Sequence, residues 1–244
     1  LDWLSAAQTK FQKEPTVKKL LVLSVAMLLP MTASAATIMQ SKHDLSTGNT
    51  TATARNTDTD RVCVFCHVPH NARADITGIW NRSDTTTTYG WGTLTTTIRG
   101  TNLPSAIGEG SDRCFSCHDG TLGSGVLANG YSFGFNTQNE TDTSGVITNS
   151  FYIINDAAMA GNHPVSIAYP GIGASGSYNG TTSGDLNASY VDVASVTGVK
   201  LYNAGGLDYG IECGSCHDPH GAGVSYFLRM TLTGSAICQE CHSK

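Results

Sequence analysis

The stretch Cys213-Gly214-Ser215-Cys216-His217 is one of four segments with the pattern C-x-x-C-H in this 244-residue chain. The other three are Cys63-Val64-Phe65-Cys66-His67, Cys114-Phe115-Ser116-Cys117-His118 and Cys238-Gln239-Glu240-Cys241-His242. These segments contain all eight cysteines of the chain. The pattern is the attachment signature of c-type haem, so the sequence predicts four covalently bound haem c groups.

The spacing of the motif explains this chemistry. Two cysteines three positions apart fit on one turn of backbone, where both sulfurs can form thioethers to one porphyrin. The histidine that follows can then ligate the iron. Four-cysteine zinc sites and disulfides are the alternatives, but neither requires a histidine after every second cysteine. The predicted thioether residues are Cys63, Cys66, Cys114, Cys117, Cys213, Cys216, Cys238 and Cys241, and the predicted proximal ligands are His67, His118, His217 and His242.

The four remaining histidines equal the number of irons that would need a second axial ligand. They are His43, His70, His163 and His220, which we predict to be the distal ligands. The competing ligand is methionine, which would raise the reduction potential, but Met39, Met159 and Met230 have no placement that demands this role. Met159 and Met230 are predicted to pack in the interior.

The order of these residues suggests one unit used twice: an upstream histidine, then C-x-x-C-H-x-P-H, then a plain C-x-x-C-H. The similarity of His70-Asn71-Ala72 and His220-Gly221-Ala222 favours a duplication. A histidine three residues after the proximal one cannot easily reach the far face of the same haem, so it should serve a neighbouring haem. The predicted pairing within the chain is His67 with His43, His118 with His70, His217 with His163, and His242 with His220.

Residues 1–35 have the features of an export signal. Lys18-Lys19 precede an apolar run, Leu20 to Leu29, and Ala33-Ser34-Ala35 matches a cleavage site. The predicted organisation is therefore a signal peptide with an upstream prefix (1–35), an extended N-terminal arm (36–60), a first dihaem unit (61–120), a haem-free insertion rich in loops and strands that contains His163 (121–212), and a second dihaem unit (213–244).

Composition predicts the fold class and excludes one kind of partner. With 27 glycines and no strong helical period, the chain should be a mostly irregular, loop-rich protein with a few short helices, small strands and a core stabilised by haem. Small strands are expected within 146–154 and 190–199. The formal net charge is −5, and residues 1–35 contain four lysines but only two acidic residues. Nucleic-acid binding through a basic surface is therefore disfavoured.

The sequence resembles multihaem cytochromes of metal-respiring bacteria, and within them the OmcE-like family of extracellular cytochrome nanowires. The resemblance rests on His43-Asp44-Leu45-Ser46, Asn162-His163-Pro164-Val165 and the stretches 63–72 and 213–221, and it covers essentially the whole chain after residue 35. It implies a head-to-tail homopolymer on the outer cell surface, with His70 or His43 ligating an iron in the adjacent subunit. It also implies that the filament passes electrons between redox partner cytochromes and extracellular acceptors.

Three functions remain open at this point. The first is electron transfer without substrate chemistry, because every iron has two histidines available. The second is catalysis of the multihaem reductase type, which needs an iron with an open position and is disfavoured by the histidine count. The third is a monomeric periplasmic electron shuttle, which shares the haem chemistry and differs only in assembly.

Overall fold

The computed structural model describes residues 38–243, except for 53, 86, 92, 99, 137–139, 155–158, 175–176, 183–188, 204–208 and 222. The predicted signal peptide lies outside the described residues. The rest of the chain, Ala36–Lys244, forms one compact unit. No helix among the described residues has both the length and the apolar character needed to cross a membrane.

The three α-helices among the described residues are short, and each contains at least one cysteine of the repeated motif. They are α2 (Glu109–His118), α3 (Cys213–Cys216) and α4 (Ala236–Gln239), while the first motif begins with a 3-10 turn at Cys63–Phe65. The longest, α2, has Glu109 and Asp112 in its first turn and His118 in its last, an order that suits the helix dipole. Further 3-10 turns lie at Ser150–Tyr152, Met159–Gly161, Val193–Ser195, Ser225–Phe227 and Thr233–Ser235.

The strands are only two or three residues long. They are β1 (Ile167–Ala168), β2 (Ser177–Tyr178), β3 (Thr181–Thr182), β4 (Tyr202–Asn203) and β5 (Tyr209–Ile211). An antiparallel sheet has the order β1-β5-β4, and β2 pairs with β3 as a hairpin. The predicted fold class is confirmed. The apolar runs expected to be strands instead contain the 3-10 turns at Ser150–Tyr152 and Val193–Ser195, capped by the side chains of Asn149 and Asp192.

Among the described residues, two small apolar clusters form part of the interior. The first contains Tyr89, Trp91, Phe115, Met159 and Val165, and the second contains Ile167, Tyr169, Ala174 and Ile211. Met159 is 2% exposed, so its predicted packing role is confirmed. Phe115, between the two cysteines of the second motif, has no exposed surface and lies 4.0 Å from Tyr89 between ring centres. The first cluster thereby anchors α2.

The N-terminal segment, predicted to be an extended arm, is instead folded by its own polar side chains. The buried Asp44 carboxylate accepts a hydrogen bond from the Ser46 amide at 3.1 Å, and the Asn49 side chain donates to the Asp44 carbonyl at 2.7 Å. Asn56 forms an isolated bridge with Phe135. Asx-type bonds of this kind replace a regular ladder.

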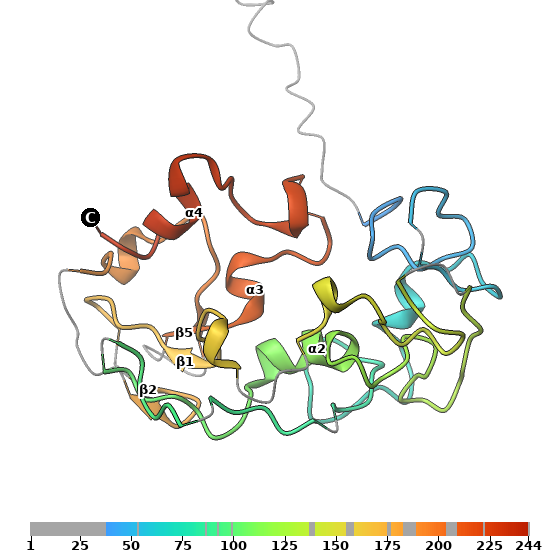
Figure 1. The fold of residues 1–244 in the computed structure, drawn as a ribbon, viewed down its shortest axis with the longest axis horizontal. Coiled ribbons are helices and arrows are strands. Elements are labelled where there is room, and N and C mark those ends of the chain that lie inside the picture. The colour runs from blue at the N-terminus through green and yellow to red at the C-terminus, as the bar shows by residue number, and fades with distance from the viewer. Residues whose placement is uncertain are drawn as a thin grey trace, which may run out of the picture. The chain divides into compact units, whose positions relative to one another are not determined.

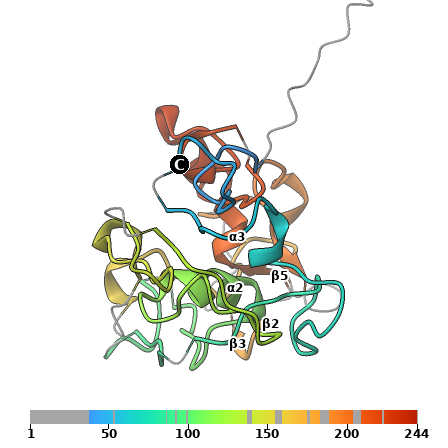
Figure 2. The ribbon, with the colours of Figure 1, turned by 90° about the vertical axis from the view of Figure 1, so that its right-hand side faces the viewer.

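The second and third motifs lie side by side. Helices α2 and α3 are in contact, and Figure 1 shows α2 in green next to α3 in orange-red. Figure 2, turned by 90°, shows β5 beside α3. Because β5 ends at Ile211 and α3 begins at Cys213, the three-stranded sheet fixes the start of the third motif.

Candidate haem-attachment sites

The first motif is closed by a segment that returns antiparallel to it. The His67 imidazole Nδ1 lies 2.8 Å from the Gly78 carbonyl oxygen. The Val68 amide donates to the Ile79 carbonyl at 3.0 Å, and the Asn81 amide donates to the Cys66 carbonyl at 2.9 Å. His67 also forms a bridge with Trp80. We call residues 78–81 the first return segment.

The third motif has the same construction. The His217 Nδ1 lies 2.9 Å from the Tyr226 carbonyl oxygen. The Asp218 amide donates to the Phe227 carbonyl at 2.7 Å, the Arg229 amide donates to the Cys216 carbonyl at 2.8 Å, and His217 bridges Leu228. Residues 226–229 are therefore the second return segment. Their match to the first, contact by contact, supports the duplication proposed from the sequence.

The second and fourth motifs are supported by the haem-free middle of the chain. The His118 Nδ1 lies 2.7 Å from the Tyr152 carbonyl oxygen, and the Ile154 amide donates to the His118 carbonyl at 2.7 Å. His242 forms a bridge with Tyr190. Segments of the insertion therefore contact the histidines of the two plain C-x-x-C-H motifs. In the two C-x-x-C-H-x-P-H elements, the return segments make the corresponding contacts.

The hydrogen bonds at the imidazoles prepare them as metal ligands. Nδ1 contacts a backbone carbonyl in His43 (3.2 Å, Pro219), His67, His118, His163 (2.9 Å, Pro164) and His217. A carbonyl can only accept, so Nδ1 must carry the proton and Nε2 keeps its lone pair. Burial lowers the pKa of His43 to about 4 and also lowers the pKa of His118. Both rings are therefore neutral near pH 7, the form that binds metal.

Six of the eight histidine rings face one another in three pairs. Ring-centre distances are 6.2 Å for His67 and His220, 6.1 Å for His43 and His118, and 6.4 Å for His163 and His242. The first pair is nearly parallel, at 14°, and the other two are nearly perpendicular, at 71° and 74°. Each pair joins a predicted proximal ligand to a predicted distal one.

These pairs differ from the pairing expected from the sequence. His67 faces His220 in place of His43, and His43 faces His118 in place of His70. The difference arises from the tertiary structure. The Pro219 carbonyl contacts His43, so the second H-x-P-H element packs onto the N-terminal segment. His70 is exposed, and no described ring faces either His70 or His217.

The ring spacing fits the predicted cofactor. A metal–nitrogen bond to imidazole is about 2 Å, so two imidazoles on opposite faces of one iron have ring centres about 6 Å apart. All eight cysteines have free thiols, as thioether attachment requires, and none forms the alternative disulfides. Among the described residues, no cluster of three or more metal-binding side chains has the geometry of a zinc site.

The four motifs follow one another in space as they do in sequence. Thiols of successive motifs interact electrostatically in three pairs: Cys66 with Cys117, Cys114 with Cys213, and Cys216 with Cys241. Burial raises the pKa of Cys66 to about 12, and the Cys117 thiol adds to this shift. The Cys114 thiol is hydrogen-bonded to Cys213, which raises its pKa. The attachment sites thus form a continuous series.

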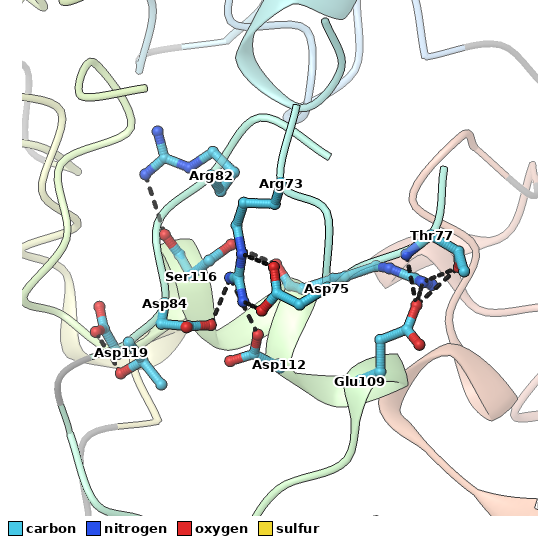
Figure 3. Close-up of polar contacts among 11 residues, drawn as sticks. Arg73, Asp75, Thr77, Arg82, Asp84, Glu109, Asp112, Ser116 and Asp119 are labelled. Carbon is cyan, nitrogen blue, oxygen red and sulfur yellow. Dashed lines mark hydrogen bonds and ion pairs between the residues drawn. The ribbon is translucent and has the colours of Figure 1, made fainter. Parts of the chain in front are cut away.

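An ionic network holds the first motif against the second (Figure 3). Arg73 forms ion pairs with Asp75, Asp84 and, at 3.5 Å, Asp112 of α2. Beside it, the Arg82 guanidinium is 1% exposed and donates to the Ser116 carbonyl at 3.0 Å. The loop after the first motif is therefore fastened to the helix of the second.

A second buried charge lies between the second and third motifs. Glu212 is 1% exposed, caps α3 and accepts hydrogen bonds from Ser111 of α2, Ser166 and Tyr178. Sequence reasoning missed both Arg82 and Glu212. The position of Glu212 next to a motif cysteine was the only available signal, and nothing in the sequence marks Arg82.

Residues 207–244 match the protein family described as "Doubled CXXCH motif". A search of curated proteins finds no match. The doubled motif indicates covalently bound haem c and hence a multihaem c-type cytochrome, a class of electron carrier.

Proposed function

We propose that the chain is a four-haem electron carrier with two imidazole ligands at every iron. Haem c, when bound, supplies a one-electron iron couple. The chain's residues attach the porphyrins through eight thiols, orient the imidazoles through backbone carbonyls, and order the sites in one series.

The observation that supports this proposal best is the spacing of the three histidine pairs. Distances of 6.1 to 6.4 Å suit two ligands on one iron and leave no room for a substrate between them. An iron with two strong ligands favours electron transfer over small-molecule chemistry. The proposal therefore assigns no catalytic residue.

The direct test is spectroscopic. A haem assay on purified protein should give four haems per chain, and the spectra of the assembled protein should show six-coordinate low-spin iron in both redox states. A persistent high-spin signal in the assembled protein, or fewer than four haems, would contradict the proposal.

We further propose that copies of the chain polymerise head to tail, with His70 of one subunit and His217 of the next as the fourth ligand pair. His43 was the other candidate, but it already faces His118 within the chain. His70 is exposed and thus accessible to another subunit. A contact between two different surfaces repeats without closing unless rotation forms a ring.

The predicted export signal and the resemblance support a location outside the cell, on its outer surface, where the polymer would pass electrons from redox partner cytochromes to extracellular acceptors. A monomeric periplasmic shuttle is the alternative. Electron microscopy of concentrated protein separates the two, because the shuttle would form no filament.

A sharper version uses His70→Ala as a chain terminator. Added to wild-type subunits, this variant can accept a neighbour's His70 through His217 but cannot donate its own. Filament length should fall as its fraction rises. Filaments of pure His70→Ala protein with unchanged length would exclude ligation by His70, whereas absent wild-type filaments would favour the shuttle.

A further inference from the structure

Successive attachment sites are separated by buried charges of opposite sign. Arg82 lies between the first and second motifs, and Glu212 lies between the second and third. Neither side chain takes part in haem attachment or iron ligation as described above. Fully buried charges are uncommon unless they are paired or hydrogen-bonded for a purpose.

The hydrogen bonds that the Arg82 guanidinium forms with the described residues all go to backbone carbonyls. It donates to carbonyl oxygens of Ser124 (3.0 Å), Val126 (2.7 Å), Ser116 (3.0 Å) and Gly123 (2.8 Å). None of the ion pairs among the described side chains includes it. Carbonyl dipoles stabilise the cation without cancelling its net charge, and its field reaches Cys66 of the first motif.

The Glu212 carboxylate occupies a site built around it. Oε2 accepts from the hydroxyls of Ser111 and, at 2.8 Å, Ser166, while Oε1 accepts from Tyr178 at 2.9 Å. A Cβ at Gly108 would lie 2.6 Å from Oε1, so this position has no room for a side chain. The site therefore depends on a glycine as well as on its hydroxyls.

The hydrogen bonds around this carboxyl are those that an ionised carboxylate accepts. The Ser111 hydroxyl accepts from the Cys213 amide at 3.0 Å, and the Ser166 hydroxyl accepts from the Gly108 amide at 2.8 Å. Each hydroxyl can then give its single proton to Glu212, and the capping amide of α3 adds a further donor. Each of these hydrogen bonds has a carboxyl oxygen as its acceptor, which suits the ionised form. No ion pair among the described residues neutralises it.

We propose that these two charges make the reduction potentials unequal along the series: Arg82 raises the potentials at the first and second motifs, and Glu212 lowers those at the second and third. One-electron reduction converts ferric to ferrous iron and removes one positive charge from the site. A buried anion therefore favours the ferric form and a buried cation the ferrous form, with little screening by solvent. The two charges place the first site above the third in potential.

This inference rests on the proposed electron-transfer function, though not on polymerisation. The experiment is a redox titration of the full holoprotein, with individual haems followed by their NMR methyl resonances. Glu212→Gln should raise the potentials at the second and third motifs and leave the fourth unchanged. Glu212→Asp keeps the charge and should leave all four potentials close to wild type. Glu109→Gln, in the exposed first turn of α2, is the matched surface control and should shift none.

A purely structural role for Glu212 predicts a different pattern, in which Gln and Asp variants lose stability alike and their potentials move together or not at all. That result would overturn the inference. If Glu212→Gln fails to mature, Arg82→Gln gives an independent test with the opposite sign, since it should lower the potentials at the first and second motifs. Unchanged potentials in a folded Arg82→Gln protein would also overturn it. The NMR spectrum of the wild-type holoprotein separately reports whether the three bis-imidazole haems paired within the chain are present, so failure of the proposed function would be visible on its own.

Discussion

The two C-x-x-C-H-x-P-H elements have equivalent backbone contacts but differ in the partner of their last histidine. In both, the return segment accepts the proximal imidazole's Nδ1 proton and pairs with the residue after it. Both His70 and His220 are exposed, but the His220 ring stacks on His67 at 6.2 Å, whereas no described ring faces His70. A duplicated element has thus been used once to join two sites within the chain and once, in our proposal, to join two chains.

The elements also differ in how they make the same sharp return. The first uses Gly78 (φ 83°) and Ile79 (φ 51°), and the second uses Tyr226 (φ 61°) and Phe227 (φ 57°). Two consecutive aromatic residues in the left-handed region store backbone strain. Phe227 has a compensating contact, because its ring stacks on His43 at 4.2 Å and 16°. The second element therefore has a strained turn together with a stacking contact to His43, a predicted ligand of another site.

The largest expected difference concerns the two distal histidines. His220→Ala should convert the haem at the first motif to high spin in both isolated subunits and filaments, because its partner lies within the chain. His70→Ala should leave the spectrum of isolated subunits unchanged. Ferric absorption and EPR spectra of both variants at low protein concentration measure this contrast. Identical spectra for the two variants would show that the elements do not differ as described.

The second expected difference is energetic. Gly78→Ala should cost about 1–2 kcal/mol, since φ is positive and an added Cβ would meet nothing within 4 Å. Gly130 has φ 85° and equally open surroundings, so Gly130→Ala is the matched control. Denaturant unfolding should give similar losses for both, but only Gly78→Ala should disturb the spectrum of the first haem. A spectral change in the control would show that the effect of Gly78→Ala does not come from the contact between the Gly78 carbonyl and His67.

The reverse change in the second element should have a smaller effect of opposite sign. Tyr226→Gly relieves about 1 kcal/mol of backbone strain, but it also removes the ring contact with Phe151 at 6.5 Å. The free energy of unfolding should therefore rise by less than the amount that Gly78→Ala loses. A clear destabilisation in the unfolding curve would mean that the tyrosine ring contributes more than the turn costs.

The smallest expected effect is at Phe227. Phe227→Leu keeps an apolar side chain but removes the flat surface that orients His43. Near-perpendicular imidazole planes give a highly anisotropic low-spin EPR signal and near-parallel planes a rhombic one. The signal of the His43–His118 site should change while the rhombic signal of the His67–His220 site stays. If both signals move together, Phe227 acts on the whole fold.

The positions and local turns of the haem-attachment motifs could be predicted from the sequence, but the pairing of the histidines could not. A C-x-x-C-H segment specifies its own turn, as the position of Cys114 and Cys117 on α2 shows. The partner of each imidazole depends on packing between segments far apart in sequence, such as the contact of His43 with the Pro219 carbonyl. Counting histidines predicts how many axial ligands the chain can supply but not how they pair.

The N-terminal segment shows a second limit. Its polar composition favoured an extended arm, yet Asp44 and Asn49 are fully buried and bonded to local backbone. Side chains of this type compete with regular structure by satisfying nearby amides and carbonyls. Periodicity cannot detect that kind of folding, because it leaves no apolar pattern. Arg82 was missed for the same reason, since carbonyls from loops receive it.

The most direct measurement is a count of low-spin haems in ferric protein before and after assembly, by EPR and magnetic circular dichroism. Isolated subunits should contain three bis-imidazole haems, one of them with near-parallel ligand planes, and a fourth with a different axial environment. Filaments should contain four bis-imidazole haems. Four such haems in a strictly monomeric subunit, or a methionine-ligated iron in either state, would contradict the histidine pairing described above.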